Sequence, residues 1–427
     1  MAHDASTLPP PDTGRQEGLT PTMHTRGEPL AYPFERGAGL DVPPVYAKLR
    51  DQPMARVRMA YGEDAWLATR YADVKTVLSD ARFTRAGAVG RDQPRMEPMV
   101  RDYGGLISHD PPEHTRLRGL MAREFSARRI ERLRVRAHEV AGELLDGIVA
   151  SGPTVDLFER FATPLPTTLN CELLGVPIEY SRFWAWAEGE ASGIAADADP
   201  GELAAEFFSQ VAALVELRRG QPGDDVLSSL VRARDEDGRI TEDELRVLVA
   251  DLLLAGFATI AGQIAASFYH LMIRPAELSR LRERPELIPQ AAEELLRYVH
   301  LDDFIAPRYA TEDVELGGVL VRAGDPVLVS PAAANRDPAV FPDAEDLVLG
   351  RTGAPHLGFG HGAHFCLGAH LARLELQVAL ETALRRLPGL RLAVPENELR
   401  WKTGGIVGSL ADLPVTFDRP TGVTGDA

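Results

Sequence analysis

The 427-residue sequence predicts a mostly α-helical protein with small β-sheets. Two observations support this fold class. Several long segments repeat apolar residues at three- or four-residue intervals, which is the period of a helix packed on a core. The β-type runs are short and lie between glycine turns. Because no repeat or composition change marks a boundary, we expect one large domain at 29–418 between flexible tails at 1–28 and 419–427.

The first elements along the chain are a β-hairpin and a helix. Residues 57–71 hold two short β-type runs around a Gly-Glu-Asp turn, which favours a hairpin. A helix is expected over 130–150, where apolar residues follow the helical period until a Gly-Pro pair ends it. Its apolar positions are Ile130, Leu133, Val135, Val140, Leu144, Leu145 and Ile148.

A long central helix is expected from Thr241 to about Ile273. Thr241 and Glu244 form a capping box at its start, and an Arg-Pro pair ends it. At 1.5 Å per residue the helix would be roughly 48 Å long, enough to cross the domain. Its apolar run, 252–262, is shorter than the roughly 18 residues that a membrane span requires. We therefore expect a buried helix.

Three further segments complete the predicted core. A helix is expected over 288–299, and short strands over 314–316 and 326–329, separated by glycine turns. Another helix is expected over 369–387, directly after Cys366.

The composition argues against several classes of function. Lys and Arg number 46 against 63 Asp and Glu, a formal charge of −17, whereas nucleic-acid binding needs clustered positive charge. The first 28 residues lack the basic flank and apolar stretch of a signal peptide. Only two cysteines occur, Cys171 and Cys366, which suits reduced thiols. We expect a cytoplasmic protein without a nucleic-acid or membrane partner.

A glycine-rich segment around Cys366 carries the most specific pattern. Several metal-binding side chains lie nearby, but their spacing does not fit the paired ligands of structural zinc sites. A glycine turn that delivers a thiolate to the start of a helix places backbone N–H groups around the sulfur. Cys366 is therefore the expected ligand, and the alternative is a metal-free buried cysteine. The segment contains His361, His364, Cys366 and His370 among the glycines Gly358, Gly360, Gly362 and Gly368.

The pattern F-x-x-G-x-x-x-C-x-G, formed by Phe359, Gly362, Cys366 and Gly368, resembles the haem-binding loop of the cytochrome P450 superfamily. The resemblance implies a triangular-prism helical domain with a minor sheet-rich region. It implies haem b (iron protoporphyrin IX) as cofactor, with the Cys366 thiolate as axial ligand of the iron and as the metal-binding residue. It also implies an oxidoreductase that activates dioxygen.

Further motifs of the same family occur in the expected order. Glu294 and Arg297 match its E-x-x-R pair, and Arg351 ends its meander and would complete a structural ion network. An E-x-x-R pair also arises by chance on many helices, and His114, Arg118, Arg308 and His364 would each alone suit a surface or a satisfied core position. By the resemblance, the haem and its propionates would be contacted by His114, Arg118, Ala255, Gly256, Arg308, Phe359, Gly360, His364, Cys366 and Gly368.

The central helix contains the family's oxygen-binding segment, with one departure. Ala255 and Gly256 are small enough to let haem and dioxygen lie close, and the Thr259 hydroxyl can bond a carbonyl one turn back. Most members carry an acid where this chain has Ala258. Protons would then come through water and Thr259, through solvent ordered by Gln263, or through the substrate.

The missing acid leaves two outcomes open. One is radical C–C or C–N coupling of an aromatic, tryptophan-containing cyclodipeptide, after hydrogen abstraction. The other is hydroxylation or epoxidation of a polyketide, terpene or macrolide-like substrate. The aromatic residues at 183–186 are more typical of helix packing than of a substrate contact, whereas the loop acids could hold a substrate N–H. The expected substrate contacts are Ala258, Gln263, Asp302, Asp303, Phe304, Ile305, Ile406 and Val407, with Thr259 and Cys366 as catalytic residues.

Eight arginines between Arg116 and Arg136 predict a docking surface. In a chain of net negative charge, this patch would attract an acidic ferredoxin that is served by a ferredoxin reductase. A solvated helix face explains the same pattern. We expect a monomer whose other partners are a small-molecule substrate and dioxygen. Functions of another class that remain open are a non-catalytic haem sensor and a zinc-binding module.

Overall fold

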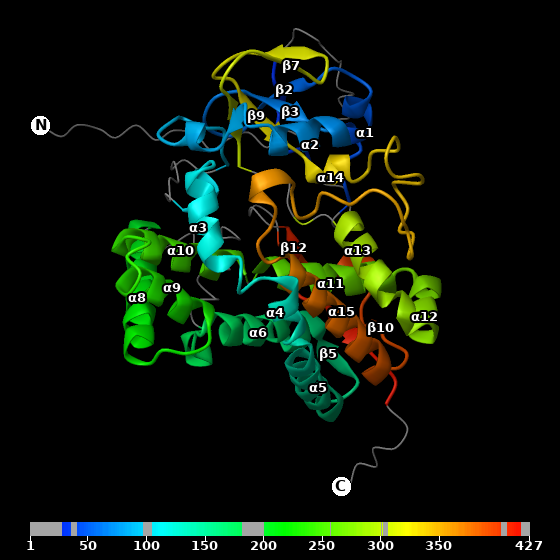
Figure 1. The fold of residues 1–427 in the computed structure, drawn as a ribbon. Helices are drawn as coiled ribbons and strands as arrows, with labels where there is room; N and C mark the ends of the chain where they lie inside the picture. Colours follow the sequence, from blue (N-terminus) through cyan, green and yellow to red (C-terminus); the bar gives the residue numbers. More distant parts are fainter. Residues whose placement is uncertain are drawn as a thin grey trace, which may run out of the picture.

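The computed structural model describes residues 28–35, 41–96, 105–181, 200–256, 258–299, 301, 306–402 and 408–419. Figure 1 shows a sheet-rich region at one end of the molecule and a larger helical region that fills the rest. The segment that carries Cys366 runs between the two. This arrangement confirms the predicted fold class.

The helical elements follow the apolar periodicity of the sequence. They are α1 (Val45–Arg50), α2 (Tyr71–Ser79), α3 (Glu113–Met121), α4 (Ala127–Glu131), α5 (Arg134–Ser151), α6 (Pro164–Leu174), α8 (Pro200–Gly220), α9 (Val226–Asp235), α10 (Glu242–Ala255), α11 (Ala258–Met272), α12 (Pro275–Glu283), α13 (Ile288–Tyr298), α14 (Pro331–Ala334) and α15 (Ala369–Arg386). Short 3₁₀ turns used below are η1 (Ala86–Ala88), η2 (Leu106–Ser108) and η6 (Gly362–His364).

The main sheet has the strand order β1-β2-β3-β9-β6-β4, and β10-β13-β5, β11-β12 and β7-β8 form smaller sheets. The strands are β1 (Leu30–Ala31), β2 (Ala55–Arg58), β3 (Ala65–Ala68), β4 (Phe83–Thr84), β5 (Thr154–Asp156), β6 (Arg308–Ala310), β7 (Val314–Leu316), β8 (Val319–Val321), β9 (Pro326–Val329), β10 (Arg391–Leu392), β11 (Trp401–Lys402), β12 (Ser409–Leu410) and β13 (Pro414–Thr416).

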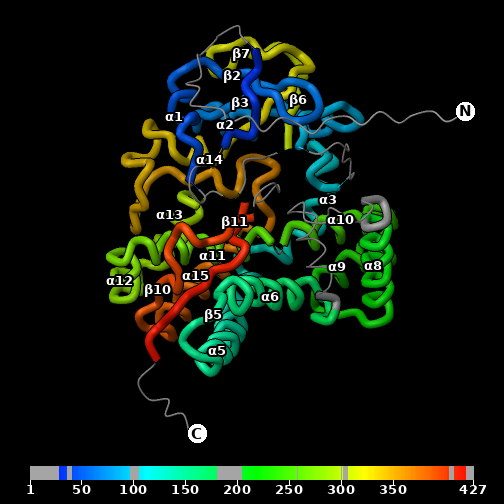
Figure 2. Tube along the Cα trace, turned by 180° about the vertical axis from the view of Figure 1, so that it is seen from behind, coloured from blue at the N-terminus to red at the C-terminus, as the bar shows by residue number. Residues whose placement is uncertain are grey.

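Pairing in the main sheet confirms the predicted hairpin. Strands β2 and β3 are antiparallel, with Arg56 opposite Trp66, and β3 continues in parallel with β9. Strand β9 in turn pairs with β6, which begins at Arg308. Figure 2 shows the C-terminal segment running past α11 towards β5, with which β13 pairs. The β10-β13-β5 sheet thus brings the C-terminal end of the described chain onto the helical region, whereas β1 lies at the edge of the main sheet.

The helix expected over 130–150 is divided in the structure. Helix α4 ends at Glu131, α5 begins at Arg134, and Gly152 (φ +116°) follows its last residue. The short break changes the helical phase. The buried face of α5 consists of Ala137, Val140, Ala141, Leu145 and Ile148. Val135, expected on that face, is 71% exposed, because it lies two residues and about 200° from Ala137.

The central helix is also divided. The capping box of Thr241 and Glu244 is present, but α10 ends at Ala255 and α11 begins at Ala258. The stretch from Glu242 to Met272 is long and apolar enough to cross a membrane by length and hydropathy alone. Its second half, from Ile260 to Met272, is buried by other elements of the protein, as a core helix would be. The helices expected near α13 and α15 and the strands β7 and β9 match their predicted positions.

Candidate active site

A cavity of about 520 Å³ lies between the central helices and the loop that carries Cys366. Thr259 and Gln263 of α11 border it on one side. Phe359 and Cys366 border it from the loop. The cavity therefore joins the two motifs that the sequence analysis identified separately.

The loop around Cys366 is shaped by backbone contacts. The Cys366 N–H donates to the Phe359 carbonyl at 2.9 Å, and the Gly360 N–H donates to the Leu357 carbonyl at 2.9 Å. Gly362 has a φ of +73°, and a Cβ there would collide with the Leu78 carbonyl of α2. Only glycine meets both conditions without strain. The loop is thus folded tightly against α2 and directs Cys366 to the start of α15.

The thiol of Cys366 is accessible from the cavity, although protein surrounds it on its other sides. Burial raises the pKa of Cys366, while the Gly368 N–H and the more distant Arg118 and Arg373 oppose that effect. The sequence analysis expected backbone N–H groups to stabilise the thiolate, but in the protein alone burial outweighs them. Deprotonation is thus favoured when a cation binds the sulfur, as in metal–thiolate sites.

Basic side chains from three separate segments gather behind the cavity. The rings of His114 (α3) and His364 (η6) lie 4.2 Å apart. Arg308 of β6 is buried and borders the cavity together with His364. Among the described residues, His114 Nε2, His364 Nε2 and Arg308 Nε have no hydrogen-bond partner.

The pKa values of this basic cluster are all lowered. Burial and the nearby Arg308 reduce the pKa of His364 to about 3, and burial and Arg118 lower that of His114. Burial reduces the pKa of Arg308 to about 10 and also lowers that of Arg118. The Asp110 carboxylate opposes the shifts of His114, Arg308 and His364 but does not outweigh burial, so the cluster still favours added anions. Two carboxylates, such as the propionates of haem, fit this cluster in charge and in hydrogen-bonding type.

Arg85, which the sequence analysis did not identify, lies in the same wall of the cavity. It is buried, it donates to the Ile107 carbonyl at 3.0 Å, and it also donates to the Pro307 carbonyl. Its positive charge contributes to the lowered pKa of His364. Arg85 therefore connects η2 to the strand that carries Arg308. No local sequence pattern indicates these contacts, because they join residues 22 and 222 positions apart.

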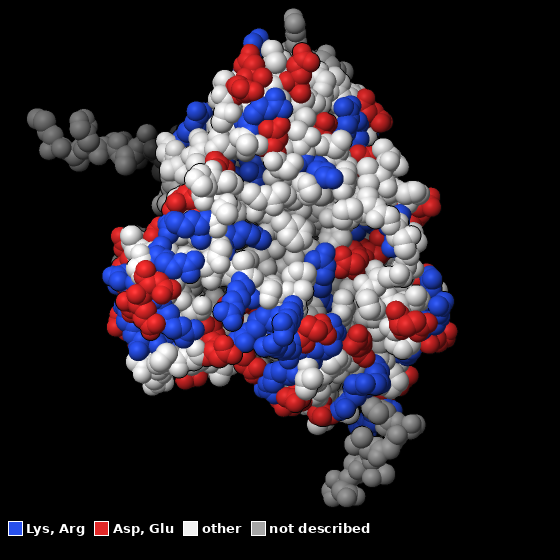
Figure 3. All heavy atoms as spheres, viewed as in Figure 1, with Lys and Arg blue, Asp and Glu red and all other residues white. Residues whose placement is uncertain are grey.

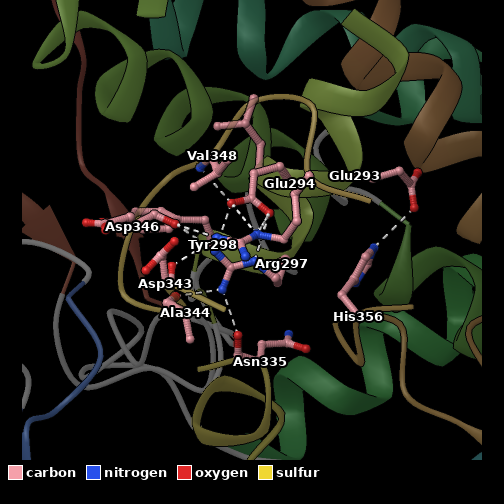
Figure 4. Close-up of polar contacts among 12 residues, drawn as sticks. Glu293, Glu294, Arg297, Tyr298, Asn335, Asp343, Ala344, Asp346, Val348 and His356 are labelled. Atoms are coloured by element: carbon pink, nitrogen blue, oxygen red, sulfur yellow. Dashed lines mark hydrogen bonds and ion pairs between the residues drawn. The ribbon is translucent and has the colours of Figure 1, made fainter. Parts of the chain in front are cut away.

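Three side chains support the Cys366 loop from outside the cavity. Arg373 of α15 lies 4.6 Å from the centre of the Phe359 ring and bonds Glu293 at 2.6 Å. His356 Nε2 lies 3.3 Å from the same carboxylate (Figure 4). Burial acts against ionisation of Glu293, but the bonds from His356 and Arg373 prevail and hold its pKa at about 2. The loop is thereby tied to α13 and α15.

A buried ion network connects α13 with the segment that precedes the loop. Arg297 bonds both oxygens of Glu294 at 2.8 Å, and Arg351 Nε bonds them at 3.0 and 3.2 Å (Figure 4). Arg297 also donates to the Asn335, Ala344 and Asp346 carbonyls at 2.7 to 2.9 Å. Arg297 and Arg351, which the resemblance groups with Glu294, thus both bond its carboxylate.

The helix break at Gly256 is bridged by side chains. The Thr259 hydroxyl donates to the Ala255 carbonyl at 3.1 Å, as predicted for this threonine. The Gly256 carbonyl accepts a bond of 3.0 Å from Asn170 of α6. Ala255 and Gly256 both border the cavity. The break therefore lies directly beside the space above Cys366.

Two predicted substrate contacts differ from expectation. Ala258 is described by the structure but is absent from the cavity wall. Gln263 borders the cavity, yet its amide N–H groups lie 3.3 Å from the Ser267 hydroxyl and 3.2 Å from the Leu295 carbonyl. Its donors are therefore directed into the protein, which weakens the idea that they order solvent.

The remaining predicted substrate residues lie outside the described residues. These are Asp302, Asp303, Phe304, Ile305, Ile406 and Val407, as well as the aromatic stretch at 183–186. Their neighbours Leu301 and Ala306 border the cavity. In the described part of the chain, no group of three or more His, Cys, Asp and Glu side chains is placed to hold a metal ion.

Comparisons with known proteins agree with this geometry. A family model described as Cytochrome P450 matches residues 195–398. The chain is 50% identical to mycinamicin IV hydroxylase/epoxidase of Micromonospora griseorubida over 398 residues, which cover 92% of this chain and all of the relative. The chain belongs to the cytochrome P450 superfamily. Members of this family bind haem through a cysteine thiolate.

Other cytochromes P450 similar to this chain perform different reactions. Nocardicin C N-oxygenase of Nocardia uniformis subsp. tsuyamanensis is 47% identical over 92% of this chain and 100% of the relative. The crystal structure of cytochrome P450mel 107F1, described with biaryl coupling reactivity, has a TM-score of 0.85 and 42% identity, and covers 91% of this chain and 99% of that structure. The chain is thus a cytochrome P450 monooxygenase of specialised metabolism. Its family does not determine its reaction.

Proposed function

We propose that this cytochrome P450 binds haem b on Cys366 and oxygenates a bacterial specialised metabolite by hydroxylation or epoxidation. The observation that carries the proposal is the basic cluster of His114, Arg308 and His364 beside the cavity that contains Cys366. These residues, with Arg118, would bind the propionates. Bound haem would supply dioxygen activation, and Ala255, Gly256 and Thr259 would border the reacting space.

The proposed reaction consumes one dioxygen molecule, two electrons and two protons. One oxygen atom enters the substrate and the other leaves as water. The chain's own residues would bind the substrate in the cavity, keep it beside Thr259 and limit the access of solvent. The relative that hydroxylates and epoxidises mycinamicin IV supports this type of reaction.

Oxidative coupling of an aromatic, tryptophan-containing cyclodipeptide is the second candidate. Ala258 stands where most family members place an acid, and a structure with biaryl coupling reactivity is 42% identical to this chain. Coupling joins two substrate carbons, or a carbon and a nitrogen, and removes one hydrogen from each. With two donor electrons and two protons, both oxygen atoms of dioxygen then leave as water.

Labelled dioxygen separates the two candidates. The holoprotein would be incubated with mycinamicin IV or with cyclo(L-Trp-L-Trp), a plant ferredoxin, ferredoxin reductase and ¹⁸O₂, and the products analysed by mass spectrometry. One ¹⁸O atom in the product supports oxygenation. A dimer without label supports coupling. Haem-loaded protein that binds both compounds but consumes no electrons would instead indicate a non-catalytic haem sensor.

The thiolate assignment has its own test. Reduced wild-type protein is expected to give the thiolate-type absorption band with carbon monoxide, and Cys366→Ser is expected to lose that band. Ser has a similar size, so the protein should stay folded, which circular dichroism checks. Cys171→Ser is the matched control, because Cys171 is buried in α6. A thiolate-type band that persists in the Cys366→Ser protein contradicts the proposal.

We further propose a ferredoxin, served by a ferredoxin reductase, as the electron donor of a monomeric cytoplasmic enzyme. Figure 3 shows Lys and Arg side chains gathered over α3 and α4, on the face that carries the Cys366 loop. Several arginines of this patch have acidic partners: Arg116 pairs with Glu113 and Arg129 with Asp224. Arg128 and Arg132 of the same patch are exposed and form no ion pair within the described residues.

Charge reversal tests the docking surface. The variant with Arg128→Glu and Arg132→Glu is expected to slow reduction by ferredoxin several-fold at low salt, with a smaller effect at high salt. Arg322→Glu, beside the β7-β8 hairpin at the sheet end of the molecule, is the control. Equal reduction rates for wild type and the double variant would remove the docking proposal.

A further inference from the structure

The break between α10 and α11 leaves backbone carbonyls without their usual helical partners. Ala255 is the last residue of α10 and Gly256 adopts a bent conformation (φ −92°, ψ −10°). Gly256 is half-buried, and a carbonyl that is shielded from water needs a donor, because leaving it unpaired costs free energy comparable to a lost hydrogen bond. Thr259, in the first turn of α11, donates to the Ala255 carbonyl at the end of α10. Within the described residues, the Gly256 carbonyl accepts a side-chain bond from another helix.

Asn170 of α6 supplies that donor. Its amide nitrogen lies 3.0 Å from the Gly256 carbonyl, 2.9 Å from the Pro166 carbonyl of its own helix and 3.3 Å from Glu375 Oε1. Asn170 is only 4% exposed, and it borders the cavity, as Gly256 and Glu375 do. The fit is close, because a Cβ on Gly256 would lie 3.1 Å from Asn170 Oδ1.

Glu375 completes the arrangement from α15. It is 1% exposed, and burial raises its pKa well above the usual range. A protonated carboxyl is a weaker acceptor than a carboxylate. At 3.3 Å its Oε1 is the most distant of the three acceptors around the Asn170 amide, so the two amide hydrogens remain directed to the Pro166 and Gly256 carbonyls. Among the described residues that border the cavity, Glu375 is the one with an acidic side chain.

We propose that Asn170, supported by Glu375, is a positioning residue that holds the Gly256 carbonyl and thereby the helix break that carries Thr259. The inference rests on the proposed dioxygen chemistry, since Thr259 borders the same cavity as Cys366. Thr259 secures the break from inside the helix, and Asn170 secures it from α6. Because this chain has Ala258 where most family members have an acid, proton delivery depends more on the position of the break and of Thr259.

The test compares four full-length holoproteins with wild type. Asn170→Leu keeps the size of the side chain and removes its donors. Asn170→Ser is a second variant that adds no apolar bulk, and its short hydroxyl would bond its own helix. Glu375→Gln keeps an acceptor for Asn170. Thr167→Val is the matched control, because Thr167 is also buried in α6 but bonds only the Thr163 carbonyl of that helix.

The readouts need no identified substrate. Carbon monoxide bound to the reduced protein is the probe, and its infrared stretching band reports the surroundings of the break. Asn170→Leu and Asn170→Ser are expected to shift or broaden this band, and Thr167→Val to leave it in place. The rate at which dioxygen reoxidises the reduced protein should change about two- to tenfold in both Asn170 variants, the size expected for one hydrogen bond. Glu375→Gln should stay closer to wild type than either of them.

Two results would overturn the inference. The first is a carbon monoxide band and a reoxidation rate in both Asn170 variants equal to those of the Thr167→Val protein. The second is normal behaviour of the Asn170 variants with slowed dioxygen consumption and an altered solvent isotope effect in Glu375→Gln, which would make Glu375 a proton supplier instead. Failure of the proposed function looks different, because wild-type protein itself would then lack the thiolate-type band.

Discussion

Replacing Glu294 by Gln should destabilise the protein strongly. Glu294 is 2% exposed and accepts bonds from Arg297, from Arg351 and from the Val348 N–H at 2.8 Å. Gln offers one acceptor oxygen and turns an amide N–H₂ towards donors, so the buried Arg297 and the half-buried Arg351 lose their counter-charge. Breaking a buried ion pair in this way costs about 3–5 kcal/mol.

The expected change in melting temperature follows from the size of the domain. An unfolding entropy of about 2.1 cal/mol/K per residue gives roughly 0.8 kcal/mol/K for the 390 or so residues of the predicted domain. The Glu294→Gln protein should therefore melt about 4–6 °C below wild type, as measured by circular dichroism of the holoproteins. The matched control is Glu277→Gln in α12.

Glu277 and Arg280 have the same i,i+3 spacing as Glu294 and Arg297, but their side chains are 30% and 44% exposed and 3.4 Å apart. Such surface pairs contribute about 0–1 kcal/mol, so the control should melt within about 1 °C of wild type. Equal melting temperatures for the two variants would refute the reasoning, because burial and the second arginine would then add nothing to the pair.

Three other perturbations have defined outcomes. Arg308→Leu should speed the transfer of haem to apomyoglobin about ten- to a hundredfold, the effect of one lost charge-assisted bond, whereas Arg391→Leu at the surface should not. Gly362→Ala should lose about 1–3 kcal/mol of stability in thermal melts, because the φ of Gly362 is +73° and a Cβ there would meet the Leu78 carbonyl. Gly147→Ala in α5 is the control and should keep its stability, because a Cβ there meets nothing. Burial raises the pKa of Asp251 to about 6, so its contribution to stability is present below its unfolded pKa and is lost as pH rises from about 4 to about 6. In thermal melts across that range, wild type should lose stability relative to Asp251→Asn as the pH rises. A difference between the two proteins that stays constant with pH would contradict this.

Local patterns in the sequence predicted the elements whose signals are themselves local. The hairpin, the capping box at Thr241, the helices near α13 and α15, and the glycine turn around Cys366 depend on neighbouring residues. The two divided helices show the limit of such signals. Apolar spacing continues across the breaks after Glu131 and Ala255, and at the second break the Gly256 carbonyl accepts a bond from Asn170 of another helix.

The contacts that sequence reasoning missed are long-range. Arg85 meets Pro307 across 222 positions, and Asn170 meets Glu375 across 205. Each is an ordinary polar residue in its own segment, and only the packing of α6 against α15, or of β4 beside β6, gives it a role. The residues proposed to bind haem could be predicted because a motif names them. Asn170 belongs to no such motif, so the structure was needed to reveal it.

The ion network around Glu294 has a consequence for how this enzyme can evolve. Arg297 and Arg351 donate hydrogen bonds to main-chain oxygens of the segment between Asn335 and Val348, among them those of Asn335, Asp343 and Ala344. Main-chain oxygens are the same whatever side chain they accompany. Mutations at the outward-facing positions of that segment can therefore accumulate while its path past the Cys366 loop is conserved.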